Sequence, residues 1–412
     1  MIKRKLVTLW RLGLHNLIWV ASYRFALKTG LIKRLTPVGL KLDGPFFECT
    51  SIKQNSALES LNLKYFGWID YSKEAIPEWG VSVVSGKKAE AQNLHWSSIS
   101  DFDLNVGDVK SIWEISRFDW LFYFVVEYIK TGDKSYLSTL NKWMEDWAAN
   151  NPVNQGVNWK CGQETSIRVM HLCLAILLLN QHKRLLPSMV EMLEQHLSRI
   201  SPTLLYAMAQ DNNHGTSEAV ALYVGGILLE HNTNSKQAVK WKKQGRFWIE
   251  NRTKRLIAND GSFSQHSVNY HRLMLDSFCL AELFRSEFNE PAFSQRTVKK
   301  LQLATHWLDI FTDELNGNVP NMGANDGAKL IPLSNTDYRD YRPTVQLASV
   351  LFFKKRAYKN SGSFNQPLKL LGLTCTDCSL NKDSEYHFSE GGYCFINKGV
   401  ARLFIRYPKF NL

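Results

Sequence analysis

The sequence lacks any long uninterrupted apolar run. A membrane-crossing helix needs about 18 or more consecutive apolar residues, and no such run occurs in the 412 residues, so we predict no transmembrane span. Cysteine is also scarce: the seven residues are an odd number at irregular spacing, which argues against a fold built on disulfides. Cys375 and Cys378 form a lone CxxC motif, which we interpret as two incidental thiols rather than a metal or redox site.

Two further absences narrow the classes of fold and chemistry. No repeat of fixed period is visible, which argues against the common solenoid repeats. The 11 histidines show no spacing typical of metal ligands. We therefore predict no metal and no other cofactor.

Charge and aromatic content are what the sequence has in surplus. Fifty basic residues against 38 acidic ones give a net charge of +12, which favours an anionic partner such as nucleic acid, anionic lipid or an acidic polysaccharide. Aromatic residues make up 12% of the chain and include 13 Trp; such rings suit sugar faces as well as protein cores. Composition alone does not choose among these partners.

The N-terminus resembles the start of a signal peptide without completing one. The first five residues, MIKRK, are basic, but Arg11, His15 and Asn16 interrupt the apolar run that follows. No convincing small-residue cleavage site comes after it. We predict that residues 6–29 form a basic amphipathic helix that packs on the fold or touches a membrane surface.

Hydrophobic periodicity divides the chain into three parts and predicts a mainly α protein. Residues 1–105 combine the N-terminal helix with an extended, strand-containing segment, which includes short alternating runs at 65–69 and 81–84. Residues 106–362 have helical periodicity with short polar connections, typical of antiparallel helical hairpins in a closed or partly closed toroid. Helices are expected at 109–130, 134–149, 163–179, 186–199, 202–209, 217–230, 235–256, 268–288, 291–315 and 344–358.

The last part, residues 363–412, is a linker followed by strands. Residues 393–407 read as two strands around a tight Asn-Lys-Gly turn. A lone hairpin is marginal in water and would expose an apolar edge. We therefore expect this hairpin to be the first piece of a β domain whose remainder is absent.

Polar residues between two helical runs, Asp211 to Glu218, form the first candidate site. The amide of Asn213 can donate hydrogen bonds to a carboxylate, and His214 can share a proton near neutral pH. Ser217 could instead cap the following helix, with Glu218 near its N-terminal end. On this stretch alone, a capped helix with a satisfied histidine is the favoured interpretation.

A second polar cluster runs from Asp260 to Arg272. Asp260-Gly261-Ser262-Phe263 is a turn and an extended step, and Tyr270 and His271 then fall near the N-terminus of the next helix. The positive potential of a helix N-terminus favours a phenolate, which a catalytic base requires. A Tyr-His pair by itself is more often part of a core and its rim.

Two smaller groups of residues could serve either the structure or the function of the protein. Lys110, Trp113, Glu114 and Arg117 have the spacing of one helix face, and either a salt-bridged structural face or a substrate wall fits them. Asn325-Asp326-Gly327 is interpreted first as a turn.

Together, Asn212-Asn213-His214 with Glu218, and Asp260–Phe263 with Tyr270-His271-Arg272, resemble the heparinase II/III-like polysaccharide lyases, a group that includes alginate and oligoalginate lyases. Further similarity covers roughly residues 100 to 412. It includes the segments Lys110–Arg117, Gly162–Glu164 with Arg168, Pro320–Gly327 and Phe388–Tyr393.

The resemblance implies an α/α toroid followed by an antiparallel β-sandwich, and cleavage of a uronate-containing polysaccharide by β-elimination. Asn213 and His214 would neutralise the uronate carboxylate, and Tyr270 would abstract the C5 proton or donate one to the leaving O4. His271 and Arg272 would favour ionisation of Tyr270 or hold a neighbouring acidic sugar. The other expected substrate-binding residues are Trp113, Arg117, Gln163, Glu164, Arg168 and Glu218.

One departure from the family pattern affects the expected activity. The family takes a further catalytic His or Tyr from the β-sandwich, and this sequence stops before that region, so weak or no lyase activity is expected of the chain. The resemblance places an acidic polysaccharide, rather than nucleic acid, as the partner. It favours the cell envelope or periplasm, while the imperfect signal region leaves the cytoplasm open; the oligomeric state is undetermined.

Two rival functions remain open at this point. A glycoside hydrolase on an α/α toroid would need two opposed carboxyl groups, for which Glu164 and Glu218 are the candidates. A non-catalytic acidic-glycan-binding protein of a polysaccharide assembly system fits the basic N-terminal helix and the incomplete β domain.

Overall fold

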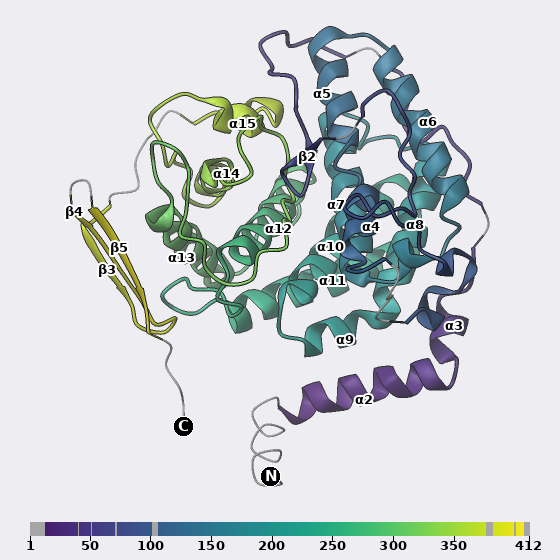
Figure 1. The fold of residues 1–412 in the computed structure, drawn as a ribbon, viewed down its shortest axis with the longest axis horizontal. Helices are drawn as coiled ribbons and strands as arrows, with labels where there is room; N and C mark the ends of the chain where they lie inside the picture. The colour runs from purple at the N-terminus through teal and green to yellow at the C-terminus, as the bar shows by residue number, and fades with distance from the viewer. Residues whose placement is uncertain are drawn as a thin grey trace. The chain divides into compact units, whose positions relative to one another are not determined.

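The computed structural model describes residues 13–39, 41–50, 52–70, 72–100, 106–375, 382–398 and 401–407. The fold is mainly helical, with a small antiparallel sheet near the C-terminus (Figure 1), which confirms the predicted fold class. The chain forms two compact units. Unit 1 comprises Met1–Ser51, Tyr71–Phe124 and Asp133–Arg246, and unit 2 comprises Ile52–Asp70, Val125–Gly132 and Phe247–Leu412.

Helices account for the regular structure of unit 1. In order they are α2 (Leu14–Lys28), α3 (Leu31–Leu35), η1 (Ala91–Asn93), η2 (Trp96–Ser98), α4 (Lys110–Trp113), η3 (Glu114–Arg117), α6 (Ser135–Asn150), η4 (Val157–Trp159), α7 (Gly162–Leu178), α8 (Pro187–Ile200), η5 (Ser201–Thr203), α9 (Leu204–Ala209) and α10 (Asn213–Asn232). Two more helices, α5 (Leu121–Thr131) and α11 (Lys236–Leu256), contain residues of both units.

The centre of unit 1 is built on α7 and α10, which pack against each other and against α8. Nearly every residue of α7 and α10 is buried, as expected for helices that are apolar on all sides. Two glycines allow α10 and α11 to touch backbone to backbone. A Cβ on Gly226 would stand 2.5 Å from the Lys242 nitrogen, and one on Gly245 would stand 2.4 Å from the Tyr223 nitrogen.

Unit 2 combines helices with two small sheets. Its elements are β1 (Lys64–Tyr65), β2 (Ile69–Asp70), α12 (Val268–Glu287), α13 (Gln295–Phe311), α14 (Arg342–Phe353), η6 (Ser363–Asn365), α15 (Gln366–Leu370), β3 (Glu385–Phe388), β4 (Tyr393–Lys398) and β5 (Ala401–Arg406). Helices α12, α13 and α14 pack on one another.

The C-terminal sheet is larger than the predicted hairpin. Strand β4 pairs with β5 as expected, but β3 adds a third antiparallel strand, in the order β3-β4-β5. Phe311 of α13 contacts the rings of Phe388, Tyr393, Phe395 and Phe404, so one face of the sheet is covered. Asn397 and Lys398 belong to β4 rather than to a turn, and Gly399 lies outside the described residues, as does Cys378 of the CxxC motif.

The predicted helix at 109–130 is wrong as a single element. Its backbone changes from α4 to the 3-10 helix η3 and then reverses at Phe118, whose φ is 70°, before α5 begins. The expected helices at 291–315 and 344–358 are shorter, and Lys354, with φ 59°, ends the second of them. Residues 65–69 do contain strands, around Phe66 and Gly67 at positive φ, whereas 81–84 supplies only an isolated bridge through Val81.

Two structural findings bear on function. Within the described ranges, no helix is long and apolar enough to cross a membrane. The same ranges contain no group of three or more His, Cys, Asp or Glu residues placed to hold a metal ion.

Candidate functional site

The first candidate stretch forms the start of α10. Asp211 adopts a left-handed conformation with φ 48°, which ends α9 and redirects the chain. Asn212 then caps α10, because its side-chain oxygen accepts a hydrogen bond from the His214 nitrogen at 3.0 Å. The expectation that Ser217 caps the helix is wrong: α10 begins four residues earlier, and Ser217 is buried inside it.

His214 and Glu218, one helical turn apart on α10, line a cavity of about 490 Å³ in unit 1. Four aromatic residues share the lining: Tyr23, Trp96, Trp113 and Tyr206. The charged lining residues besides Glu218 are Arg24, Lys160 and Arg199. Aromatic faces together with a cationic surplus are suited to an acidic sugar.

Glu218 is the buried carboxyl group of this cavity. Its side chain is 3% exposed, and one carboxyl oxygen has no hydrogen-bond partner. Burial raises the pKa of Glu218 to about 8, against the smaller opposing effect of Arg199. A glycine at the first position of α7 makes room for it, since a Cβ on Gly162 would stand 2.5 Å from the nearer carboxyl oxygen. Near neutral pH, this carboxyl group can therefore donate a hydrogen bond.

Arg199 is fixed in the same lining. Its guanidinium donates to the carbonyls of Trp159 and Lys160, at 2.8 and 2.7 Å, and to the Thr203 hydroxyl at 3.2 Å. It also lies over the Trp96 ring, 3.4 Å from the centroid. These contacts hold the positive charge of Arg199 in a fixed orientation. Local sequence patterns did not identify Arg199 as a candidate site residue.

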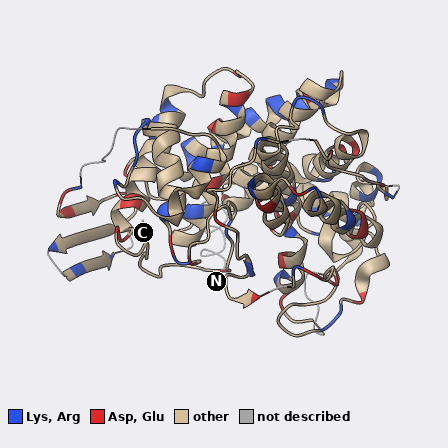
Figure 2. Ribbon diagram, turned by 90° about the horizontal axis from the view of Figure 1, so that it is seen from above, with Lys and Arg blue, Asp and Glu red and all other residues tan. Residues whose placement is uncertain are grey.

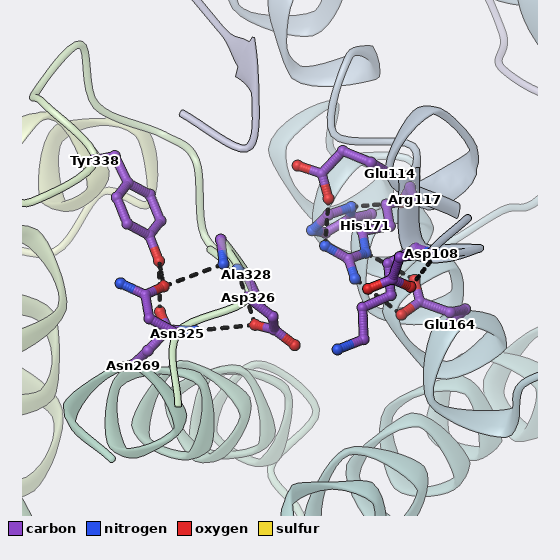
Figure 3. A network of polar contacts seen from close by, with 12 residues as sticks. Asp108, Glu114, Arg117, Glu164, His171, Asn269, Asn325, Asp326, Ala328 and Tyr338 are labelled. Atoms are coloured by element: carbon purple, nitrogen blue, oxygen red, sulfur yellow. Dashed lines mark hydrogen bonds and ion pairs between the residues drawn. The ribbon is translucent and has the colours of Figure 1, made fainter. Parts of the chain in front are cut away.

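Glu164 and Arg117 form a buried ion-pair cluster with Glu114 (Figure 3). Arg117 holds Glu164 through two hydrogen bonds, 2.7 and 2.9 Å long, and also donates to Glu114. The Arg117 carbonyl contacts the His171 ring at 2.7 Å. The sequence left open whether this helix face is a salt-bridged structural face or a wall of the substrate site. Glu114 and Arg117 form salt bridges, whereas Trp113 lines the cavity.

The other two residues expected from α7 lie in the core. Gln163 is 4% exposed and donates to the Ser217 hydroxyl at 3.1 Å. Arg168 is 1% exposed, and its guanidinium lies 5.2 Å from the ring centroids of both Trp147 and Trp159. Neither residue belongs to the lining of the cavity.

Tyr270 occupies the first turn of α12 in unit 2. Ser267 caps this helix by accepting a hydrogen bond from the Tyr270 nitrogen at 3.1 Å. The Tyr270 hydroxyl donates to one carboxylate oxygen of Asp326 at 2.9 Å, and the Asn269 amide donates to the other at 3.1 Å. Figure 3 shows Asn269 between the Asp326 carboxylate and the Tyr338 hydroxyl, which donates to the Asn269 side-chain oxygen at 2.8 Å. Asp326, interpreted first as part of a turn, therefore accepts a hydrogen bond from the candidate catalytic tyrosine.

His271 and Arg272 do not accompany Tyr270 toward a substrate. His271 stacks on Trp307 with ring centroids 4.6 Å apart and contacts the Ala304 carbonyl at 2.8 Å. Burial lowers the pKa of His271 to about 4, so the ring is neutral and cannot promote ionisation of Tyr270. Arg272 is 1% exposed and lies over the rings of Tyr338 and Tyr341.

A second cavity, of about 450 Å³, lies in unit 2 beside the turn at Asp260. Its lining includes four basic residues, Lys254, Arg255, Arg296 and Lys300, and one acidic residue, Glu390. Elsewhere, basic and acidic residues are interspersed along helices and loops (Figure 2). Each unit thus has a cavity with a cationic lining.

Comparisons with known proteins place the chain in a family. The heparinase II/III N-terminus family model matches residues 86–327, which is more than half of the chain. Among solved structures, the chain is similar to heparinase III, with 16% identity, a TM-score of 0.48, and coverage of 97% of this chain and 60% of that one. It is also similar to heparan sulfate lyase HepC from Pedobacter heparinus, with 17% identity, a TM-score of 0.44, and coverage of 81% and 51%.

The chain thus spans about half to three-fifths of the length of these two structures. No curated protein matches it. The matched region contains both candidate stretches, with Asn213, Tyr270 and Asp326. The chain belongs to the heparinase II/III family.

Proposed function

We propose that the chain is a polysaccharide lyase that cleaves an acidic, uronate-containing polysaccharide by β-elimination. The observation that carries the proposal is the heparinase II/III N-terminus match, because residues 86–327 include both Asn213 and Tyr270. The cationic linings of the two cavities support an acidic substrate.

The reaction makes specific demands on these side chains. A base, which in the family pattern is a further His or Tyr of the β-sandwich, takes the C5 proton. The C4–O4 bond breaks as a C4=C5 double bond forms, and O4 leaves with a proton from a general acid. The C5 proton becomes acidic enough only when hydrogen-bond donors neutralise the neighbouring carboxylate. We assign this neutralising role to Asn213 and His214, as the resemblance to the family implies.

Tyr270 is better suited to donating a proton than to abstracting one. Its hydroxyl donates a hydrogen bond to the Asp326 carboxylate, so it carries the proton that a general acid supplies. We therefore propose that Tyr270 protonates the leaving O4. This choice between the two roles left open by the sequence rests on the 2.9 Å hydrogen bond to Asp326.

The rival hydrolase is the less favourable interpretation. A hydrolase of the usual kind needs two carboxyl groups that exchange protons with substrate or water. Glu218, with its pKa of about 8, suits the role of general acid. Glu164 does not suit the second role, because Arg117 holds both of its carboxylate oxygens.

The test offers alginate, heparan sulfate and other uronate polymers to the full chain and follows both unsaturated-uronate absorbance and new reducing ends. A lyase produces both signals. Tyr270→Phe and Asn213→Ala are expected to abolish them, whereas Tyr136→Phe and Asn150→Ala on α6 make the same chemical changes elsewhere and should retain them. Because weak activity is expected of the chain, the assay uses a high enzyme concentration and long incubation, and the absence of unsaturated product from every polymer under those conditions would refute the proposal. Reducing ends alone would select the hydrolase, and glycan binding that survives both site variants without turnover would select the binding protein.

A further inference from the structure

Helix α2 presents an apolar stripe to solvent. Leu14, Ile18 and Phe25 are 73%, 53% and 67% exposed, and Ala21 between them is also exposed. At about 100° per residue, these four side chains fall within an arc of about 60° on the helix. The stripe is therefore one continuous surface along the length of α2.

The opposite face of α2 already secures the helix to unit 1. Tyr23 stacks on Tyr206 of α9, with ring centroids 4.0 Å apart, and the Asn16 amide donates to Asp211 at 3.0 Å. These contacts with unit 1 therefore lie on the face of α2 opposite the stripe. Large apolar side chains at that density on a surface usually mark a binding face.

The apolar surface continues beyond α2. Leu31, Leu35 and Val38 are 43%, 49% and 49% exposed. Six large exposed apolar residues thus occur within 25 residues of sequence.

Basic charge is concentrated in the same part of the chain. The first 42 residues contain nine Lys or Arg and no Asp or Glu, whereas the other 370 contain 41 basic and 38 acidic residues. Arg24 and Lys28 border the stripe on α2, and Lys33 and Arg34 follow on α3; all four are exposed. The first 42 residues, which include the apolar stripe, therefore carry +9 of the net charge of +12.

We propose that residues 14–38 dock the protein on the surface of an anionic phospholipid bilayer. The stripe would enter the boundary between headgroups and acyl chains, and Arg24, Lys28, Lys33 and Arg34 would contact lipid phosphates. An apolar stripe flanked by Lys and Arg is the pattern of interfacial helices. The 15 residues of α2 are about 22 Å long, too short to cross the bilayer core of about 30 Å, so the helix lies along the surface.

Docking would also place the unit 1 cavity near the bilayer. Tyr23, Arg24 and Leu27 of α2 belong to its lining, so the same helix contributes to the membrane face and to a cavity wall. The proposal itself depends on the stripe and the charges, and it stands whether or not the chain is a lyase.

The experiment is vesicle flotation with the full chain. Vesicles contain phosphatidylcholine alone or phosphatidylcholine with 30–50% phosphatidylglycerol, roughly the range over which basic segments respond to anionic lipid. We expect flotation with anionic vesicles only, and loss of flotation at high salt as the charges are screened. Ile18→Glu/Phe25→Glu should weaken the vesicle partition coefficient at least about tenfold, and Arg24→Gln/Lys28→Gln about fivefold per charge removed.

Leu315→Glu is the matched control, because Leu315 is 85% exposed in unit 2 and lies outside the stripe; it should float like the unchanged chain. Ile18→Ser/Phe25→Ser removes apolar surface without adding charge, and circular dichroism verifies that each variant is folded. No flotation of the unchanged chain, or equal flotation of a folded stripe variant and the control, overturns the proposal. A dimer that the stripe variants dissociate, without vesicle binding, also overturns it and assigns the stripe to a second copy of the chain.

Discussion

Replacing Glu218 with Gln tests the electrostatics of the unit 1 cavity directly. Glutamine keeps the shape of a protonated glutamate but cannot ionise. Glu218 is 3% exposed, and burial raises its pKa from the ordinary 4.5 to about 8. The folded protein therefore favours the neutral form, whereas the unfolded chain loses the proton near pH 4.5.

The sign of the pH dependence follows from this displacement. The stability contributed by neutral Glu218 is fully present below pH 4.5 and is lost as the pH rises through about 8. At 1.36 kcal/mol per pH unit, the loss is at most roughly 5 kcal/mol, and nearly all of it has occurred by about pH 9. Glu218→Gln should escape this loss, so its advantage over the unchanged protein should grow from about pH 5 upward.

Urea unfolding of both proteins at intervals from pH 5 to pH 9 measures the effect as a difference in free energy of unfolding. Glu74→Gln is the control, because Glu74 is an exposed glutamate in unit 1 and its replacement should leave the pH dependence unchanged. Parallel curves for Glu218→Gln and the unchanged protein would refute the reasoning. They would mean that Glu218 is ionised in the folded state and that the cavity solvates its charge.

Three further substitutions test other parts of the structure. Arg117→Met removes the ion pairs that Arg117 makes with the buried carboxylates of Glu114 and Glu164 and should cost about 3 kcal/mol or more of unfolding free energy. Arg117→Met/Glu164→Gln should recover part of it, and a loss no larger than that of exposed Arg24→Met would contradict the ion-pair assignment. Gly245→Ala should lower the melting temperature and cost about 1–3 kcal/mol of unfolding free energy, because the added Cβ meets backbone atoms of Tyr223 and Ala219. A melting temperature equal to that of exposed Lys243→Ala would show that α10 and α11 can separate. Asp326→Asn replaces the carboxylate that accepts the Tyr270 hydrogen bond with a neutral, weaker acceptor of the same shape. If this bond positions the Tyr270 hydroxyl, kcat should fall while KM changes little, and an unchanged kcat would contradict the role given to Asp326.

Hydrophobic periodicity predicted most of the helices because, over long stretches, the apolar residues at helical spacing are those that the fold buries. Helices α6, α8 and α11 lie close to their predicted ranges. The break at Phe118 escaped prediction, because apolar residues continue at helical spacing on both sides of it and only the backbone, at φ 70°, reverses. Strand β3 escaped for a related reason: four residues are too short for a period of two to be recognised.

Partners distant in sequence were beyond the reach of local patterns. Asp326 lies 56 residues from Tyr270 in the sequence. An Asp is common in a turn such as Asn325-Asp326-Gly327, so the turn alone accounted for it and a contact with Tyr270 was not predicted. Arg199 lies on α8 and Glu218 on α10, so no local spacing marked Arg199 as a charge that acts on Glu218. Both residues acquire a role only when the fold brings their partners to them.

The geometry of an α-helix shows, from the sequence alone, that Tyr270, His271 and Arg272 cannot act together on one substrate. Consecutive residues of an α-helix point about 100° apart, so three neighbours cannot all face one substrate. Here Tyr270 turns to Asp326, His271 to Trp307 and Arg272 to Tyr338. Burial keeps His271 neutral, and Arg272 donates hydrogen bonds to backbone carbonyls, whereas the Tyr270 hydroxyl donates to the Asp326 carboxylate. Neighbouring polar residues of one helix should therefore be expected to face different surroundings. The catalytic proposal here depends on Tyr270 and on Asp326, which accepts its hydrogen bond.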